Sequence, residues 1–222
     1  MKALFFAVAA TLALAGCSDG GSTTGSTTAD AGTAPVDTGV ATDAGAPVDA
    51  GAPAETYPAG PYGSSVGRLF EPFSLTACNR EGGDASWRFD QSDFFNNRLT
   101  LIMISAMWCV PCQNEAMQIE REVVERYRDM GVRIVQVLVQ DPQRRAITPS
   151  QCNTWVNRFG LTFPVLMDPQ FITQPFVPMA AFPGNVIVDR RGRIRWREYG
   201  SDRGLSSIRT AIDEVLAAPE GN

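Results

Sequence analysis

The chain has 222 residues, of which 19 are basic, 24 are acidic, five are cysteines and none is histidine. Six acidic residues and no basic residue lie within residues 18–60, whereas 18 arginines balance 18 acidic residues from Pro61 onward. This balance argues against nucleic acid as a partner, and the length allows one or two domains.

The first 16 residues have the pattern of an export signal. A single basic residue, Lys2, precedes an almost unbroken apolar run, which is shorter than the ~20 residues that a membrane-spanning helix needs. The run ends in Leu14-Ala15-Gly16-Cys17, which resembles the lipobox of bacterial lipoproteins. This resemblance implies cleavage before Cys17, which would then carry a lipid anchor in the cell envelope and face the periplasm. Ser18, rather than Asp, favours the outer over the inner membrane. The alternative is an ordinary signal peptide with an incidental cysteine.

Residues 17–60 are a low-complexity segment of Gly, Ala, Thr, Ser, Pro and Asp, in which Tyr57 is the only aromatic residue. Such a composition buries too little apolar surface to offset the entropy lost on ordering. We therefore expect a disordered linker over residues 17–60 and a folded domain over residues 61–222. The repeated aspartates could instead bind calcium, but their spacing matches no calcium-binding loop.

From Pro61 onward, hydrophobic periodicity predicts strands that alternate with helices. A short strand near Phe73–Leu75 comes first. The elements that follow are a buried strand at Leu99–Ile104, an amphipathic helix at Pro111–Met130, a strand at Val132–Val139, a helix from Thr148-Pro149 to Gly160, strands at Pro164–Met167, Asn185–Asp189 and Arg193–Arg197, and a helix at Leu205–Ala217. This order predicts an α/β fold with a central mixed sheet flanked by helices.

Cys109 and Cys112 form a Cys-x-x-Cys pair between the strand 99–104 and the helix that follows it. At the N-terminus of a helix, free N–H groups and the helix dipole favour the thiolate, which is the form that attacks disulfides. We expect Cys109 to be the partly exposed attacking sulfur and Cys112 to be the buried resolving thiol. A structural disulfide and half of a zinc site are the alternatives. The absence of histidine and of a second such pair argues against zinc, so we expect no metal and no cofactor.

Five landmarks between about Pro72 and Leu216 make the chain resemble a thioredoxin-fold protein, and within that fold the exported, membrane-tethered TlpA-like and ResA-like thiol-disulfide oxidoreductases. They are Phe73-Ser74-Leu75, Trp108-Cys109-Val110-Pro111-Cys112, Glu115, Phe159-Gly160-Leu161-Thr162-Phe163-Pro164-Val165, and Phe182-Pro183 followed by the hairpin 186–194. Three positions depart from the pattern. Gly184-Asn185 replaces the usual Thr after the proline, Met117 replaces a helix-kinking Pro, and Met103 replaces the buried acid of thioredoxins.

The resemblance implies roles for the residues around the dithiol. Glu115, three residues after Cys112, would move the proton of the resolving thiol, and a solvated glutamate on the helix surface is the alternative. Pro183 would be a cis-proline that lies against the sulfurs and pairs its backbone with an incoming peptide strand. Trp108, Pro111 and Phe182 would help to bind that peptide.

Cys78 and Cys152 lie outside the active-site sequence. In an exported protein they are expected to pair with each other, although two free thiols or a second redox pair are alternatives. Four arginines, at positions 191, 193, 195 and 197, alternate with Gly192, Ile194 and Trp196, which predicts arginines on one face of a strand. A charged edge that prevents aggregation explains them, and a docking site for an acidic partner is the alternative.

The leading functional hypothesis is a lipid-anchored oxidoreductase that reduces disulfides of exported proteins and receives electrons from an upstream thiol donor. The resemblance implies clients in cytochrome c maturation or metal-site assembly. A thiol peroxidase of the peroxiredoxin type is the alternative, but Met107-Trp108-Cys109 replaces its Pro-x-x-x-Thr-x-x-Cys pattern. A copper carrier would need Cys-x-x-x-Cys and a histidine, and a redox-silent binding lipoprotein would not need an intact dithiol.

Overall fold

The computed structural model describes residues 57–82, 86–89, 94–200 and 204–219. The predicted signal peptide, the predicted lipidation site Cys17 and the predicted linker up to residue 56 lie outside the described residues. No helix among the described residues is long and apolar enough to cross a membrane.

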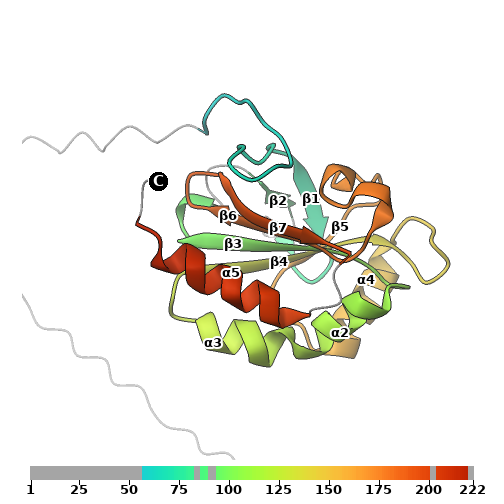
Figure 1. The fold of residues 1–222 in the computed structure, drawn as a ribbon. Coiled ribbons are helices and arrows are strands. Elements are labelled where there is room, and N and C mark those ends of the chain that lie inside the picture. The colour runs from blue at the N-terminus through green and yellow to red at the C-terminus, as the bar shows by residue number, and fades with distance from the viewer. Residues whose placement is uncertain (1–56, 83–85, 90–93, 201–203, 220–222) are drawn as a thin grey trace, which may run out of the picture. The chain divides into compact units, whose positions relative to one another are not determined.

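A seven-stranded mixed sheet forms the centre of the domain, with the strand order β2-β1-β5-β4-β3-β6-β7 (Figure 1). The strands β3, β4 and β5 are parallel, and the other pairings are antiparallel. All eight residues of β3 are buried, as expected of a central strand with both faces covered. The strands are β1 (Ser74–Ala77), β2 (Ser86–Arg88), β3 (Leu99–Ala106), β4 (Val132–Gln140), β5 (Val165–Met167), β6 (Gly184–Asp189) and β7 (Ile194–Tyr199). The predicted α/β architecture is confirmed. The three-residue strand β2 was not predicted, because it is too short for a period-two pattern to stand out.

The helices are α2 (Val110–Ile119), a π-helical segment (Glu120–Val124), α3 (Glu125–Tyr127), α4 (Pro149–Phe159) and α5 (Leu205–Ala217). Thr148 caps α4 through the backbone N–H of Gln151, and Gly160 ends it in the left-handed conformation, as predicted from those residue types. The long helix predicted at Pro111–Met130 contains the π-helical segment and ends at Tyr127. Met130 therefore lies in the turn beyond the helix and is exposed, contrary to its predicted place on the apolar face.

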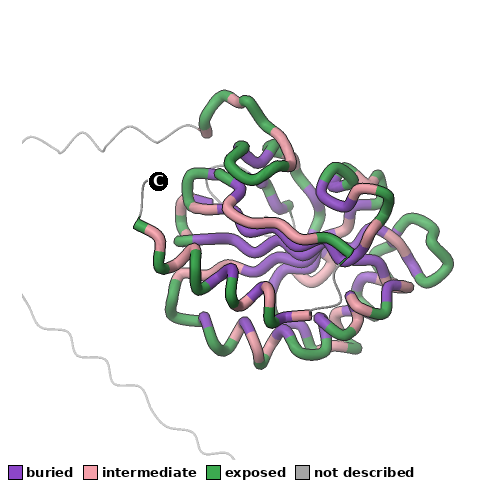
Figure 2. The backbone as a smooth tube through the Cα atoms, in the orientation of Figure 1, coloured by how far each residue is buried: buried purple, intermediate pink, exposed green. Residues whose placement is uncertain are grey.

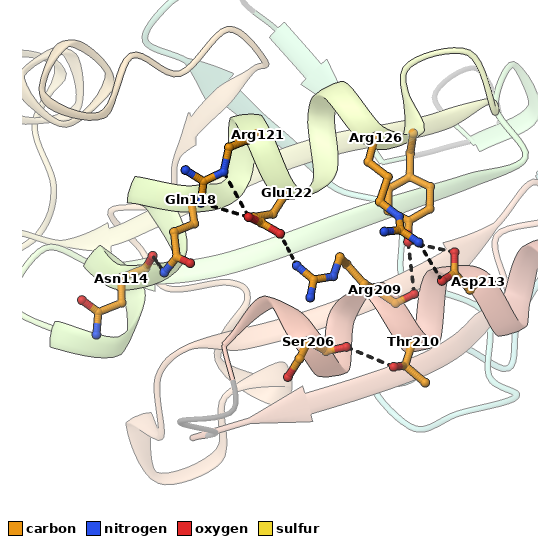
Figure 3. Close-up of polar contacts among 10 residues, drawn as sticks. Asn114, Gln118, Arg121, Glu122, Arg126, Ser206, Arg209, Thr210 and Asp213 are labelled. Atoms are coloured by element: carbon orange, nitrogen blue, oxygen red, sulfur yellow. Dashed lines mark hydrogen bonds and ion pairs between the residues drawn. The ribbon is translucent and has the colours of Figure 1, made fainter.

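The helices α2, α3 and α5 lie on the same side of the sheet, and their buried residues face it (Figures 1 and 2). Side chains hold α5 against the π-helical segment and α3 (Figure 3). Arg209 of α5 forms an ion pair with Glu122, and Asp213 lies 3.6 Å from Arg126. Tyr127 donates a hydrogen bond to Asp213 at 2.8 Å. These contacts anchor the far end of the helix that begins at the dithiol.

The folded region begins earlier than predicted. Tyr57, which the sequence placed in the linker, donates a hydrogen bond to the carbonyl of Phe70 at 2.6 Å. Its hydroxyl lies so close to Gly192 that a Cβ atom at that position would be 2.3 Å away. An aromatic ring has apolar surface to bury, so Tyr57 docks on the domain although the residues around it are small.

The strand β7 lies at the edge of the sheet, as predicted, but its arginines do not share one face. Val188 pairs with Ile194 and Ile187 pairs with Trp196, so a bulge at Arg195 interrupts the alternation. Each of the three arginines after the turn has a partner: Arg193 donates to the carbonyl of Gly67, Arg195 to Asp189, and Arg197 to the carbonyl of Ser64. Arg193 and Arg197 therefore fasten the segment before β1 to this edge, whereas Arg195 contacts the neighbouring strand β6.

Candidate active site

Cys109 and Cys112 are joined by a disulfide at the N-terminus of α2, with their Cα atoms 5.3 Å apart. Cys109 is the N-cap residue of the helix, and its sulfur accepts a hydrogen bond from the backbone N–H of Cys112 at 3.2 Å. The geometry follows from the sequence, because β3 ends at Ala106 and Pro111 favours the first turn of a helix. After reduction, the same N–H and the helix dipole would favour a thiolate at Cys109.

Cys109 is more enclosed than the sequence indicates. Cys112 is fully buried, as expected, but Cys109 is only 3% exposed and was predicted to be partly exposed. The two cysteines belong to one hydrophobic cluster with Trp108 and Phe182, whose rings meet edge to face at 5.6 Å. In this oxidised structure, the sulfur of Cys109 is bonded to a fully buried partner.

Trp108 is held by two residues that the sequence analysis did not identify. Its indole N–H donates to the side-chain carbonyl of Gln140 at 2.9 Å, and the guanidinium carbon of Arg144 lies 3.9 Å from the ring centroid. Gln140 ends β4, and its backbone carbonyl accepts a hydrogen bond from Met107 at 2.9 Å. Gln140 could have been found from the sequence, because it is a polar residue at the end of an apolar strand. Nothing in the sequence pointed to Arg144.

The peptide bond between Phe182 and Pro183 is cis, and it leads directly into β6. The carbonyl of Pro183 accepts a hydrogen bond from the backbone N–H of Gly200 at 2.9 Å, and the predicted pairing of this backbone with a peptide strand stays a prediction. A Cβ atom at Gly184 would lie 2.2 Å from a methyl group of Val177. This close approach explains why glycine stands where the resembled proteins have Thr.

Glu115 is buried, not solvated on the helix surface, and only 2% of it is exposed. Its Oε1 atom accepts a hydrogen bond from Nδ2 of Asn185 at 3.0 Å. The pKa of Glu115 is raised to about 7, mainly by burial; the hydrogen bond from Asn185 acts in the opposite direction, and the charge of Glu198 adds a smaller upward contribution. A carboxyl group with a pKa near neutrality can both accept and donate a proton under physiological conditions.

Of the predicted site residues, the structure brings five together at the C-terminal end of β3 and the start of β6: Trp108, Cys109, Cys112, Phe182 and Pro183. Glu115 lies one helical turn beyond Cys112 on the same face, and Pro111 is half-buried in the first turn of α2. Asn185 is the residue of this site whose contact was not anticipated. An amide within the apolar run of β6 was its signal in the sequence.

Cys78 and Cys152 form a second disulfide, with Cα atoms 6.1 Å apart. Cys78 follows β1 and Cys152 lies in α4, so the bond joins the N-terminal strand region to this helix. The strands β5 and β4 separate β1 from β3. Among the described residues, no three Cys, His, Asp or Glu side chains gather as potential metal ligands.

Comparison with known proteins places these features in a family. The model of the AhpC/TSA family matches residues 66–197. The thiol-disulfide oxidoreductase ResA of Geobacillus thermodenitrificans is 30% identical over 88 residues, which are 40% of this chain and 47% of that protein. The ResA of Geobacillus kaustophilus is 30% identical over 108 residues, which are 46% of this chain and 58% of that protein. The chain thus spans about half the length of these curated relatives.

A solved structure supports the fold. The crystal structure of a secreted thiol-disulfide isomerase from Corynebacterium glutamicum superimposes with a TM-score of 0.54 at 18% identity, covering 68% of this chain and 86% of that one. The thioredoxin fold predicted from the five landmarks is therefore confirmed.

Proposed function

We propose that this chain, which belongs to the AhpC/TSA family, is a thiol-disulfide oxidoreductase that reduces disulfides of exported proteins. The observation that carries the proposal is the pair Cys109–Cys112 at the start of α2, where a backbone N–H points at the sulfur of Cys109. A purely structural disulfide would not need a sulfur at the N-cap, where the helix stabilises negative charge.

The reaction begins with the reduced enzyme. The thiolate of Cys109 attacks one sulfur of a client disulfide and forms a mixed disulfide, and the other client sulfur leaves as a thiolate that takes up a proton. Cys112 then loses its proton and attacks the sulfur of Cys109. This step releases the second client thiolate and closes the Cys109–Cys112 disulfide, so two electrons have passed to the client.

Glu115 supplies the proton transfer in this scheme. Its carboxylate lies one turn after Cys112 on the same face of α2 and would accept the proton of the resolving thiol. An upstream dithiol donor would then attack the disulfide at Cys109. Cys112 would leave as a thiolate and recover the proton from Glu115, while Cys109 remains bound to the donor in a mixed disulfide. The second donor thiol, as a thiolate, would then attack the donor sulfur of this mixed disulfide. This step closes the donor disulfide and releases the thiolate of Cys109, which restores the reduced enzyme.

Apolar side chains surround the dithiol and suit an unfolded or extended client. Trp108, Pro111 and Phe182 would contact the peptide beside the sulfurs, as the resemblance implies. Three nearby segments also carry exposed apolar residues, namely Val110 at the start of α2, Ile172 after β5, and Met179 in the segment before Pro183. Burial of such residues against a client would contribute affinity without sequence specificity.

The membrane attachment is part of the proposal, with Cys17 as the lipidated residue and the periplasmic side of the envelope, preferentially the outer membrane, as the location. Its support is the lipobox-like sequence Leu14-Ala15-Gly16-Cys17. Tyr57, which docks beside Gly192 in the turn between β6 and β7, marks where the chain from this anchor would reach the domain. Leu99 pairs with Asp189, so this turn lies at the end of β3 opposite the dithiol. The eight residues of β3 span ~25 Å. A linker that reaches the domain at this turn would therefore lie far from the dithiol and leave it open to clients.

A trapping experiment tests the function. The full chain with Cys112→Ser should accumulate client proteins as mixed disulfides on Cys109, and the variant with both active-site cysteines replaced by Ser should accumulate none. The wild-type chain should reduce insulin disulfides with dithiothreitol as the donor and without peroxide. Peroxide consumption at a comparable rate would favour the thiol peroxidase, and absence of both activities and of any trapped client would leave only a binding protein.

A further inference from the structure

Asn185 occupies an unusual place for an amide. It lies in β6 next to Val186, Ile187 and Val188, and only 1% of it is exposed. Met103 faces it from β3 on one side and Glu198 faces it from β7 on the other. Burial of an amide without a hydrogen bond costs free energy. At this position, the amide of Asn185 donates a hydrogen bond to Glu115.

The hydrogen bond distinguishes the two oxygens of Glu115. Oε1 accepts from Nδ2 of Asn185 at 3.0 Å, whereas Oε2 is buried and has no hydrogen-bond partner within the described part of the chain. The Oδ1 atom of Asn185 is likewise buried without a partner there. Two buried acceptor atoms without a partner create a local deficit of hydrogen-bond donors. A proton that arrives at Oε2 relieves this deficit.

We propose that Asn185 is a positioning residue for proton transfer: it holds Oε1 of Glu115 and thereby leaves Oε2 as the oxygen that exchanges a proton with Cys112. The inference rests on the proposed oxidoreductase function. In the balanced step, the S–H bond of Cys112 breaks, an O–H bond forms at Oε2, and the electron pair stays on sulfur to attack Cys109. The reverse transfer follows when Cys112 leaves during reduction of the enzyme.

The surroundings explain why the carboxylate needs this hydrogen bond. Glu198, held by a hydrogen bond from Ser207 of α5 at 2.6 Å, places a second negative charge near Glu115 from β7. Met103 of β3, which pairs with Asn185, carries no charge. Cys112 is the titratable group on the same face of α2 as Glu115. Burial and Glu198 both favour the protonated form, and Asn185 is the group that favours the ionised form.

A matched pair of variants tests the role of Asn185. Asn185→Thr and Asn185→Val have side chains of the same shape, but only Thr retains a hydroxyl that can donate to Oε1. The carboxyl carbon of Glu115, assigned by its loss in Glu115→Gln, is titrated by 13C NMR in the full chain. We expect the Val variant to shift the midpoint upward by about one pH unit and the Thr variant to stay near the wild type. The same shifts should appear in the pH profile of mixed-disulfide resolution.

Equal midpoints in the wild-type and Val proteins, or equal shifts in the Thr and Val proteins, would overturn the proposal. If Asn185→Val does not fold, the pair Asn185→Ser and Asn185→Ala makes the same comparison with smaller side chains. The titration of Glu115 needs no turnover. A protein that reduces no client would therefore disprove the function while the midpoints still report on Asn185.

Discussion

The backbone N–H of Cys112 points at the sulfur of Cys109 at a distance of 3.2 Å. The first cysteine thus accepts a hydrogen bond from the helix it caps, whereas the second is fully buried within that helix. The two sulfurs have different surroundings although only two residues separate them, and this difference supports the attacking role proposed for Cys109.

Selective alkylation should reveal this asymmetry. At pH 7 the reduced Cys112→Ser protein should react with iodoacetamide at least about tenfold faster than the reduced Cys109→Ser protein, because the position at the helix N-cap raises the thiolate fraction of Cys109. Mass spectrometry of the two single-cysteine sites measures the rates, and denatured samples provide the control. Equal rates in the folded proteins would contradict the assignment.

Glu115 should make the stability of the fold depend on pH. Its pKa is raised by burial from 4.5 to about 7 in the folded chain. Between these values the folded state holds a proton that the unfolded state has lost, so the free energy of unfolding falls as pH rises through this window. The contribution is fully present below pH 4.5 and is lost above about pH 7, a change of about 3 kcal/mol.

Glu115→Gln removes this titration and preserves the shape of the side chain. Urea unfolding of both proteins at several pH values between 4 and 8 measures the difference. As the pH rises from 4.5 to about 7, the free energy of unfolding of the wild type should fall relative to that of Glu115→Gln. Parallel curves would show that Glu115 titrates alike in the folded and unfolded chains.

The disulfide between Cys78 and Cys152 should contribute stability without taking part in turnover. It closes a loop with a sequence separation of 74 residues, for which the loss of unfolded-chain entropy corresponds to about 4 kcal/mol. Replacement of both cysteines by Ala should lower the free energy of unfolding by a large part of that amount. Insulin reduction by the folded variant should equal that of the wild type, since two strands separate β1 from β3. Loss of turnover in the folded variant would instead indicate a second redox pair.

Gly184 should tolerate no side chain while Val177 is present. The Cβ atom of Gly184→Ala would lie 2.2 Å from a methyl group of Val177, so we expect a loss of about 1–3 kcal/mol. Val177→Ala in the same chain should recover part of this loss, because it removes the methyl group in conflict. A double-mutant cycle from urea unfolding measures the coupling between the two residues, and additive losses would mean that the segment before Pro183 simply moves aside.

Much of the fold could be predicted because its signals are local. The helix α5 has the predicted bounds Leu205–Ala217, and α4 lies between the predicted Thr148 and Gly160. The strand β7 shows where such a pattern fails. Its alternating arginines predict one charged face, but the bulge at Arg195 rotates the strand after Ile194, and nothing in the period-two pattern indicates the extra residue.

The sequence by itself determined the order of strands and helices and the place of the dithiol at a helix N-terminus, because backbone periodicity and capping depend on residues within a few positions of one another. Tertiary structure alone decided which polar groups meet. The register of β6 between β3 and β7 brings Asn185 to Glu115, 70 residues away, and sets Glu198 beside them. A contact across that distance depends on how the sheet and α2 pack, which no local pattern encodes.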